Sequence, residues 1–184
     1  MKTEAFLLTK KGNPEEAFQL SEVTLPALKA NDVLIETEAF GLNYADVMAR
    51  RGLYREAPAF PCVIGYEVVG TIIQTGSSVD ITLIGKRVVA FTRFGGYAKH
   101  VITTKDAIAE IGKMPVNDAL ALATQGVTAY YMSNYISPVR TGEHVLIHAA
   151  AGGVGTLLIQ LAKQAGAIVI AKVSSKEKQE KSIL

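Results

Sequence analysis

Cysteine, tryptophan and histidine are scarce in this sequence. Its 184 residues include one cysteine, Cys62, three histidines and no tryptophan. A single cysteine excludes a disulfide within the chain and a cysteine-rich zinc lobe, and it is typical of proteins that fold in a reducing compartment. We therefore expect a cytoplasmic protein.

Long apolar runs and an excess of one charge are also missing. No stretch of about 18 or more apolar residues occurs, so the sequence predicts no membrane-spanning segment. The apolar run at residues 5–8 is too short for a signal peptide. The 19 basic and 17 acidic side chains are mixed along the chain, which argues against a nucleic-acid-binding surface. With 49% hydrophobic residues, the composition is that of a soluble globular protein.

About the first 120 residues have the pattern of a β-rich domain with many turns. A short helix is predicted over residues 44–51, with Asn43 as its N-terminal cap and Gly52 as its stop. An irregular loop with Pro58 and Pro61 follows it. The predicted strands cover residues 33–40, 68–73, 86–91 and 97–103.

From Asn117 onward the apolar pattern changes to that of helices alternating with buried strands. Helices are predicted over 118–123 and 127–135, and then a strand over 143–147, a helix over 156–166 and a strand over 167–171. This order predicts an α/β domain that follows a β domain, with a boundary near Leu122. The expected domains are therefore residues 1–122 and residues 123–184.

A glycine-rich turn joins the first strand of the predicted βαβ unit to its helix. It reads Ala150-Ala151-Gly152-Gly153-Val154-Gly155. A helix N-terminus offers unpaired N–H groups, and small residues let a pyrophosphate approach them, so this frame predicts a dinucleotide site. Ala151, Gly152, Gly153 and Val154 are the expected contacts. A nucleotide-hydrolase loop is excluded because Thr156 follows Gly155 without a lysine between them, whereas a turn that merely allows close packing remains an alternative.

The segment after the second strand of this unit indicates which dinucleotide binds. Residues 172–178 carry lysines and serines and place no acid at the strand end, where an NAD site usually has one. Ser174 and Lys178 are expected to bind the 2′-phosphate of NADPH, with Lys176 as a further candidate. Alternatively, these lysines solvate the outer face of a helix capped by Ser175, and the two interpretations are compatible.

Several motifs together resemble one family along nearly the whole chain. They are residues 41–46, 51–54, 61–70, 126–130 and 148–155. This set resembles the zinc-independent quinone oxidoreductase branch of the medium-chain dehydrogenase/reductase superfamily, and residues 43–54 also resemble its vesicle amine transport protein subgroup. The resemblance implies a GroES-like β-rich N-terminal domain followed by the first part, βαβ, of a Rossmann nucleotide-binding domain.

The positions of the family's zinc ligands hold other residues in this chain. Zinc-dependent members carry a Cys shortly after the glycine at position 41 and a His-Glu pair after the one at position 65. This chain has Asn43-Tyr44 and Tyr66-Glu67 there, and neither segment offers a sulfur or imidazole ligand. On a strand, His144 and His148 would lie about 13 Å apart, too far to share one ion. We therefore expect no metal.

Without a metal, the resemblance implies hydride transfer from NADPH to a quinone or an α,β-unsaturated carbonyl, whose conjugation accepts the electrons. It also implies that Asn43 and Tyr54 line the catalytic pocket and that Thr128 contacts the nicotinamide ribose. Plainer roles remain open: Asn43 and Thr128 are good helix caps, Tyr54 is able to pack on the proline loop, and Asp46 favours a helix dipole.

The chain ends within the next predicted helix, after two of the about six strands of a nucleotide domain. We therefore expect a truncated domain with open sheet edges. The resemblance implies a homodimer for the full-length protein. The alternative hypothesis is a non-catalytic fragment or interaction module that self-associates through its open sheet edge.

Overall fold

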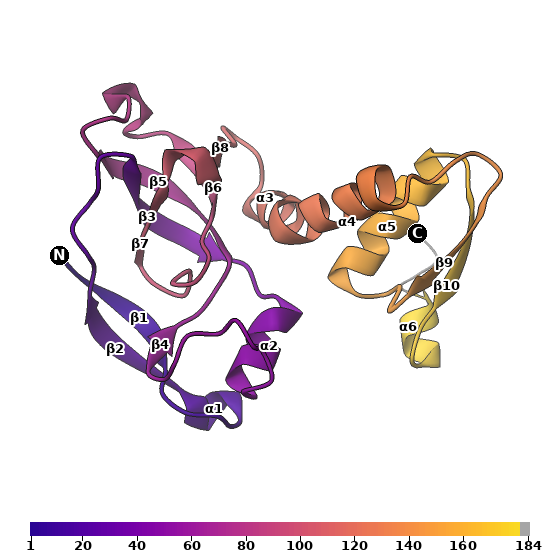
Figure 1. The fold of residues 1–184 in the computed structure, drawn as a ribbon, viewed down its shortest axis with the longest axis horizontal. Helices are drawn as coiled ribbons and strands as arrows, with labels where there is room; N and C mark the ends of the chain where they lie inside the picture. The colour runs from indigo at the N-terminus through magenta and orange to yellow at the C-terminus, as the bar shows by residue number, and fades with distance from the viewer. Residues whose placement is uncertain (181–184) are drawn as a thin grey trace. The chain divides into compact units, whose positions relative to one another are not determined.

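The computed structural model describes residues 1–180 of the chain. Their contacts divide the chain into two compact units, with the boundary between Leu120 and Ala121. Figure 1 shows the strand-rich N-terminal unit in indigo to rose and the helix-rich C-terminal unit in orange and yellow. No helix within residues 1–180 combines the length and the apolar character that crossing a membrane requires.

Two sheets build the N-terminal unit. The larger is antiparallel, has the strand order β7-β3-β5-β6-β8, and is formed by β3 (Asp32–Phe40), β5 (Glu67–Thr75), β6 (Arg87–Phe91), β7 (His100–Thr104) and β8 (Ile108–Glu110). The smaller has the order β2-β1-β4 and is formed by β1 (Lys2–Leu8), β2 (Phe18–Thr24) and β4 (Cys62–Val63). Short helical segments join the strands: α1 (Pro14–Ala17), α2 (Tyr44–Arg50), η1 (Ile81–Leu83), η2 (Lys105–Ala107) and α3 (Val116–Leu120).

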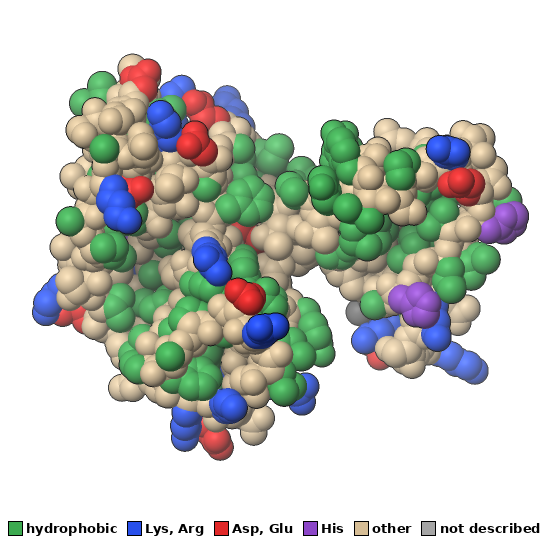
Figure 2. Space-filling view, in the orientation of Figure 1, with side chains coloured by type: hydrophobic (Ala, Val, Ile, Leu, Met, Phe, Trp, Pro, Cys, Tyr) green, Lys and Arg blue, Asp and Glu red, His purple; other side chains and the backbone are tan. Residues whose placement is uncertain are grey.

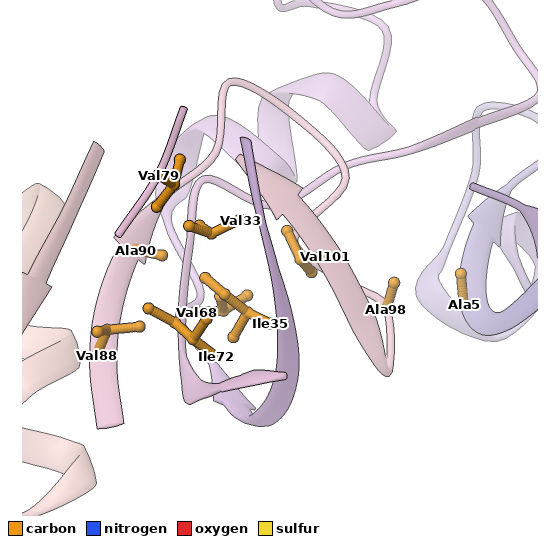
Figure 3. Packing of buried hydrophobic residues seen from close by; sticks show 10 residues of the cluster. All are labelled: Ala5, Val33, Ile35, Val68, Ile72, Val79, Val88, Ala90, Ala98 and Val101. Carbon is orange, nitrogen blue, oxygen red and sulfur yellow. The ribbon is translucent and has the colours of Figure 1, made fainter. Parts of the chain in front are cut away.

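The core of this unit lies against one face of the larger sheet. Successive residues of a strand face opposite sides, so every second apolar side chain enters the core. Val33 and Ile35 of β3 pack there against Val68 and Ile72 of β5, as Figure 3 shows. These four side chains are fully buried. The strands that the alternating pattern predicted are thus present, with their apolar face inward.

A second apolar cluster holds α2 in place. It consists of Leu8, Ala17, Ala49, Cys62, Ile64 and Tyr97. Ala49 is the contribution of α2, and its small side chain lets the helix lie close to β1 and β4. The same cluster therefore fixes the N-terminus of α2, which carries Asn43.

Several features of this unit differ from the sequence-based expectation, among them the short elements β4, β8, η1 and η2, which were not predicted. Helix α1 and strand β2 were not predicted, because the alternation in β2 is weak and its residues are at most half-buried. The strand expected from Tyr97 begins at His100. The segment before it pairs instead with β1, since Phe6 N–H donates to the Tyr97 carbonyl and Ala5 bridges to Ala98. This pairing orients the Tyr97 side chain into the second cluster.

The C-terminal unit contains the expected βαβ arrangement. Strands β9 (His144–His148) and β10 (Ile168–Lys172) are parallel, and helix α5 (Gly153–Gln164) connects them. Ile159 of α5 packs on Ile147 and Ala150 beside the sheet. Before β9 the chain is helical, and after β10 one more helix follows; these segments are η3 (Ala121–Gly126), α4 (Val127–Tyr131), η4 (Met132–Ile136) and α6 (Lys176–Glu180). The two helices predicted over 118–123 and 127–135 correspond to helical segments on either side of a break at Ala123, whose backbone is non-helical (φ −64°, ψ −107°).

We expect Ile72→Ala to destabilise the N-terminal unit by about 2–5 kcal/mol, because it removes a fully buried side chain and leaves a cavity. Its neighbour Ile73 is 38% exposed on the other face of β5, so Ile73→Ala should cost less than about 1 kcal/mol. Urea unfolding followed by far-ultraviolet circular dichroism measures both. Equal losses for the two variants would contradict the assigned faces of β5.

Candidate active site and nucleotide-binding turn

Asn43 and Asp46 form a reciprocal capping box at the start of α2. The Asn43 N–H donates to Asp46 Oδ2 at 2.8 Å, and the Asn43 side chain faces the backbone N–H of Asp46. The prediction that Asn43 caps this helix is confirmed. Asp46 is only 5% exposed, so it does more than favour the helix dipole from the surface. It is a buried group that the local structure has to satisfy.

The Asn43 side-chain amide also contacts a second buried acid. Its Nδ2 donates to Glu67 Oε1 at 2.9 Å, and Glu67 is 1% exposed at the first position of β5. The carboxylate lies against Gly41, where any side chain would overlap Glu67 Oε1. A glycine at the end of β3 is therefore what allows Glu67 to reach Asn43.

Tyr97 connects the two carboxylates. Burial raises the pKa of Asp46, and hydrogen bonds from the Asn43 backbone, the Tyr97 side chain and the Gly65 backbone oppose that rise. Burial is also the largest cause of the raised pKa of Tyr97, followed by the charges of Asp46 and then Glu67. Tyr97 therefore keeps its proton beside the Asp46 carboxylate.

Tyr54 lies in the loop after α2 and packs on Tyr66. Their rings meet edge-on with centroids 6.2 Å apart, and Tyr66 in turn lies 5.5 Å from the Phe94 ring. Burial raises the pKa of Tyr66, and the neighbouring Tyr54 hydroxyl raises it further, while the buried Tyr66 hydroxyl itself has no hydrogen-bond partner. Because Glu67 follows Tyr66 directly, the structure brings the two residues expected to be catalytic, Asn43 and Tyr54, to the same Tyr66-Glu67 segment.

The glycine turn of the C-terminal unit is tightly folded onto its own backbone. Ala149 has a φ of 51°, in the left-handed region, and its carbonyl accepts the Gly152 N–H at 2.8 Å. A side chain at Gly155 would overlap this same carbonyl oxygen. The first helical bond of α5 runs from Thr156 N–H to the Gly152 carbonyl, so the amides of Gly153–Gly155 precede it and have no acceptor within the helix.

The parallel register places Ser174 at the same sheet edge as this turn. Lys172 pairs with His148, and the Ala150 N–H donates to the Lys172 carbonyl at 3.1 Å. Ser174 follows two residues later and is exposed, as is Lys178 in α6. The carboxyl edge of β9 and β10 therefore carries the glycine turn, a hydroxyl group and lysines.

Thr128 lies in the first turn of α4, which packs against α5. It is exposed, and its hydroxyl donates to the Thr124 carbonyl at 2.6 Å. Gln125 lies one turn earlier and contacts the glycine turn, since a side chain at Gly153 would overlap the Gln125 amide. Of the nine predicted site residues, Asn43 and Tyr54 belong to the N-terminal unit and the other seven to the C-terminal unit.

Neither the histidines nor the cysteine are grouped as metal ligands. Within residues 1–180 no group of three or more His, Cys, Asp or Glu side chains is placed to hold an ion. His144 and His148 are both exposed on β9, whereas His100 Nδ1 lies 3.0 Å from Thr3 Oγ1. Cys62 is buried, and burial raises the pKa of its thiol.

Four residues of these sites were not predicted from the sequence as site residues. Asp46 was considered only for the helix dipole, and Glu67, Tyr97 and Gln125 were given no role. One signal was present for Glu67, the only charged residue of the mostly apolar strand Glu67–Thr75, which it opens. A charge at the first position of a buried strand needs donors, and that need points to the neighbouring helix cap.

Comparisons with known proteins identify relatives of the whole chain. Residues 29–133 match the model of the alcohol dehydrogenase GroES-like domain. A probable quinone oxidoreductase of Schizosaccharomyces pombe is 36% identical over 94% of this chain and 53% of its own length. Quinone oxidoreductase 1 of Escherichia coli is 34% identical over 95% and 53%. The zebrafish (Danio rerio) synaptic vesicle membrane protein VAT-1 homolog is 33% identical over 96% and 37%, so the chain spans about half or less of these relatives.

Solved structures have the same fold. The human synaptic vesicle membrane protein VAT-1 homolog-like protein superposes with a TM-score of 0.91 at 31% identity, over 98% of this chain and 59% of its own. The Escherichia coli quinone oxidoreductase complexed with NADPH gives 0.90 at 31% identity, over 98% and 55%. The expected GroES-like fold with a partial Rossmann domain is thereby confirmed. The chain belongs to the alcohol dehydrogenase GroES-like family, in the quinone oxidoreductase branch of the medium-chain dehydrogenase/reductase superfamily.

Proposed function

We propose that this protein is an NADPH-dependent, zinc-independent reductase that transfers hydride to a quinone or an α,β-unsaturated carbonyl compound. The observation that carries the proposal is the glycine turn before α5, which closes on the Ala149 carbonyl and presents the first amides of a 12-residue helix. The quinone oxidoreductases among its relatives, one of them complexed with NADPH, support it. The single cysteine and the family resemblance favour a cytoplasmic protein, homodimeric at full length.

The residues of the turn fit a pyrophosphate. Ala151, Gly153 and Val154 would hold it through amides at or beside the positive end of the α5 dipole, and Gly152, whose N–H is bound to Ala149, would line it with its backbone. Small residues here leave the backbone accessible, and Gly155 lets the turn close beneath them. The alternative of a purely structural turn explains Gly155 and Gly153, where a side chain would overlap the Ala149 carbonyl and the Gln125 amide respectively, but no comparable overlap requires glycine at the exposed Gly152.

The neighbouring edge fits a 2′-phosphate. Ser174 and Lys178 would bind it, since a hydroxyl and an ammonium group both donate to a dianion. Residues 172–176 contain no carboxylate that would repel this group or bind a ribose 2′-hydroxyl in its place. The lysines also solvate α6, and that role does not exclude phosphate binding.

The remaining site residues would orient the acceptor. Bound NADPH would supply the hydride, so the protein needs only to donate hydrogen bonds or a proton to the acceptor oxygen. Asn43 and Tyr54 are the proposed donors, each held by a neighbour, Glu67 and Tyr66 respectively. The Thr128 hydroxyl already donates to Thr124, so its oxygen would accept from a ribose hydroxyl of the cofactor.

A second candidate function is an interaction module that self-associates through the open edge of the β9–β10 sheet. The exposure of its apolar side chains favours this candidate, since Leu146, Ile168 and Ile170 are 56%, 52% and 51% exposed. Figure 2 shows further hydrophobic side chains over the helices of the same unit. Surfaces of this kind mark contact sites in soluble proteins.

We expect NADPH to raise the melting temperature of the protein more than NADH does at equal concentration, because only NADPH carries the 2′-phosphate. Differential scanning fluorimetry with both nucleotides measures the difference. Equal protection by the two, or none by either, would contradict the NADPH assignment.

Lys178→Ala should raise the Kd for NADPH about tenfold, the loss of roughly one charge-assisted contact. The Kd for NADH should stay the same. Lys163→Ala provides a matched control, because this exposed lysine lies in the last turn of α5, at the end opposite the glycine turn. Titration calorimetry gives the Kd of each variant and of the parent chain for NADPH and for NADH. An unchanged Kd for NADPH in Lys178→Ala would remove Lys178 from the site.

Light scattering of the 184-residue chain, combined with nucleotide binding, separates the two candidate functions. The reductase proposal expects NADPH to bind, and it expects Ile170→Lys to leave that binding unchanged. The module candidate expects an oligomer without nucleotide affinity that Ile170→Lys dissociates, because a charge is costly in an apolar contact.

A further inference from the structure

We infer that Glu67 is a positioning residue that fixes the orientation of the Asn43 amide, so that Asn43 acts on a bound acceptor as a hydrogen-bond donor. This inference rests on the proposed function for the identity of the acceptor, a quinone or enone oxygen. It rests on the geometry of the N-terminal unit alone for the orientation of the amide.

The chemistry of the two groups determines which end of the amide meets Glu67. The oxygen and nitrogen of an asparagine side chain have nearly the same shape, so packing by itself does not distinguish them. An ionised carboxylate only accepts hydrogen bonds, and therefore selects the nitrogen. The structure has this arrangement, with Nδ2 donating to Glu67 Oε1 at 2.9 Å.

The surroundings of Glu67 confine its carboxylate to one position relative to the Asn43 amide. It is 1% exposed, and its backbone belongs to the central strand β5, where it pairs with Phe91 of β6. Its carboxylate fills the space left by the missing side chain of Gly41. A carboxylate confined in this way leaves the Asn43 amide one orientation to adopt.

The opposite side of Asn43 is fixed as well. Its backbone N–H is bound to Asp46 Oδ2, and its side chain faces the Asp46 N–H in the capping box. One N–H of the side-chain amide is taken by Glu67, and the second N–H lies about 120° away in the amide plane. This second N–H is the group that Asn43 offers to an acceptor oxygen, where negative charge develops during reduction.

Substitutions of Glu67 test whether its carboxylate selects the orientation of the Asn43 amide. In Glu67→Gln the new amide both donates and accepts, so the contact at position 67 no longer selects the nitrogen of Asn43, and only the Asp46 N–H of the capping box still favours one orientation. Glu67→Asp keeps the charge but withdraws the carboxylate by one methylene, which also breaks the contact. Glu36→Gln is the matched control, because it makes the same chemical change at an exposed position of β3.

Hydrogen exchange of the Asn43 side-chain amide, followed by ¹⁵N NMR and assigned by its loss in Asn43→Ser, tests the orientation. We expect protected, well-separated Nδ2 protons in the parent chain and in Glu36→Gln. In Glu67→Gln and Glu67→Asp we expect exchange roughly tenfold faster, since one charge-assisted bond is lost. Unchanged exchange in either folded Glu67 variant would overturn the inference.

Steady-state kinetics test whether the orientation of Asn43 affects the reaction. We expect Glu67→Gln to lower kcat for a quinone or enone at least about tenfold, while the Kd for NADPH stays the same. A merely structural role would lower stability and leave kcat per folded molecule intact, and that result would overturn the positioning role. If the parent protein reduces no such compound, the proposed function fails, whereas the NMR result still decides whether Glu67 orients Asn43.

Discussion

Buried carboxylates impose the central constraint on the N-terminal unit. Asp46 and Glu67 are 5% and 1% exposed, and a charge removed from water is tolerated only where donors replace the water. The Asn43 backbone N–H serves Asp46 Oδ2 and the Asn43 amide serves Glu67, while Tyr97 and the Gly65 backbone lower the pKa of Asp46, whose Oδ1 is buried without a hydrogen-bond partner. The start of α2 and the ends of β3 and β5 must therefore meet at one place. The site geometry follows from this requirement more than from any single motif.

The constraint also explains residues that would otherwise be unremarkable. Gly41 is glycine because the Glu67 carboxylate occupies the space of its side chain. Tyr97 lies before β7 because its segment pairs with β1, which turns the ring toward Asp46 and the aromatic cluster. Removing one member of this network would leave a buried charge without its donor, so its members are expected to depend on one another.

The sequence predicted those parts of the structure that local patterns determine. The alternating strands that build the core around Val33 and Val68, the capping of α2 by Asn43, and the βαβ unit all depend on residues close together in the chain. The contacts of Glu67 and Tyr97 could not be predicted in this way, because they join residues 24 or more positions apart. The left-handed Ala149 was also missed, since alanine gives no signal for that conformation and the turn imposes it from outside.

The two units differ in how well they bury their own apolar surface. The N-terminal unit encloses a ten-residue buried cluster between its strands, whereas the cluster beside the β9–β10 sheet has three buried members, Ile147, Ala150 and Ile159, and the other buried apolar side chains described in the C-terminal unit are Ala123, Ala129 and Ala162. One face of the β9–β10 sheet stays exposed in the described residues, with Leu146 and Ile170 upon it. A ligand that binds only the folded unit stabilises it, and its relative contribution is larger where the buried core is smaller. If the glycine turn binds a dinucleotide, as proposed above, that binding and the folding of this unit would be thermodynamically coupled.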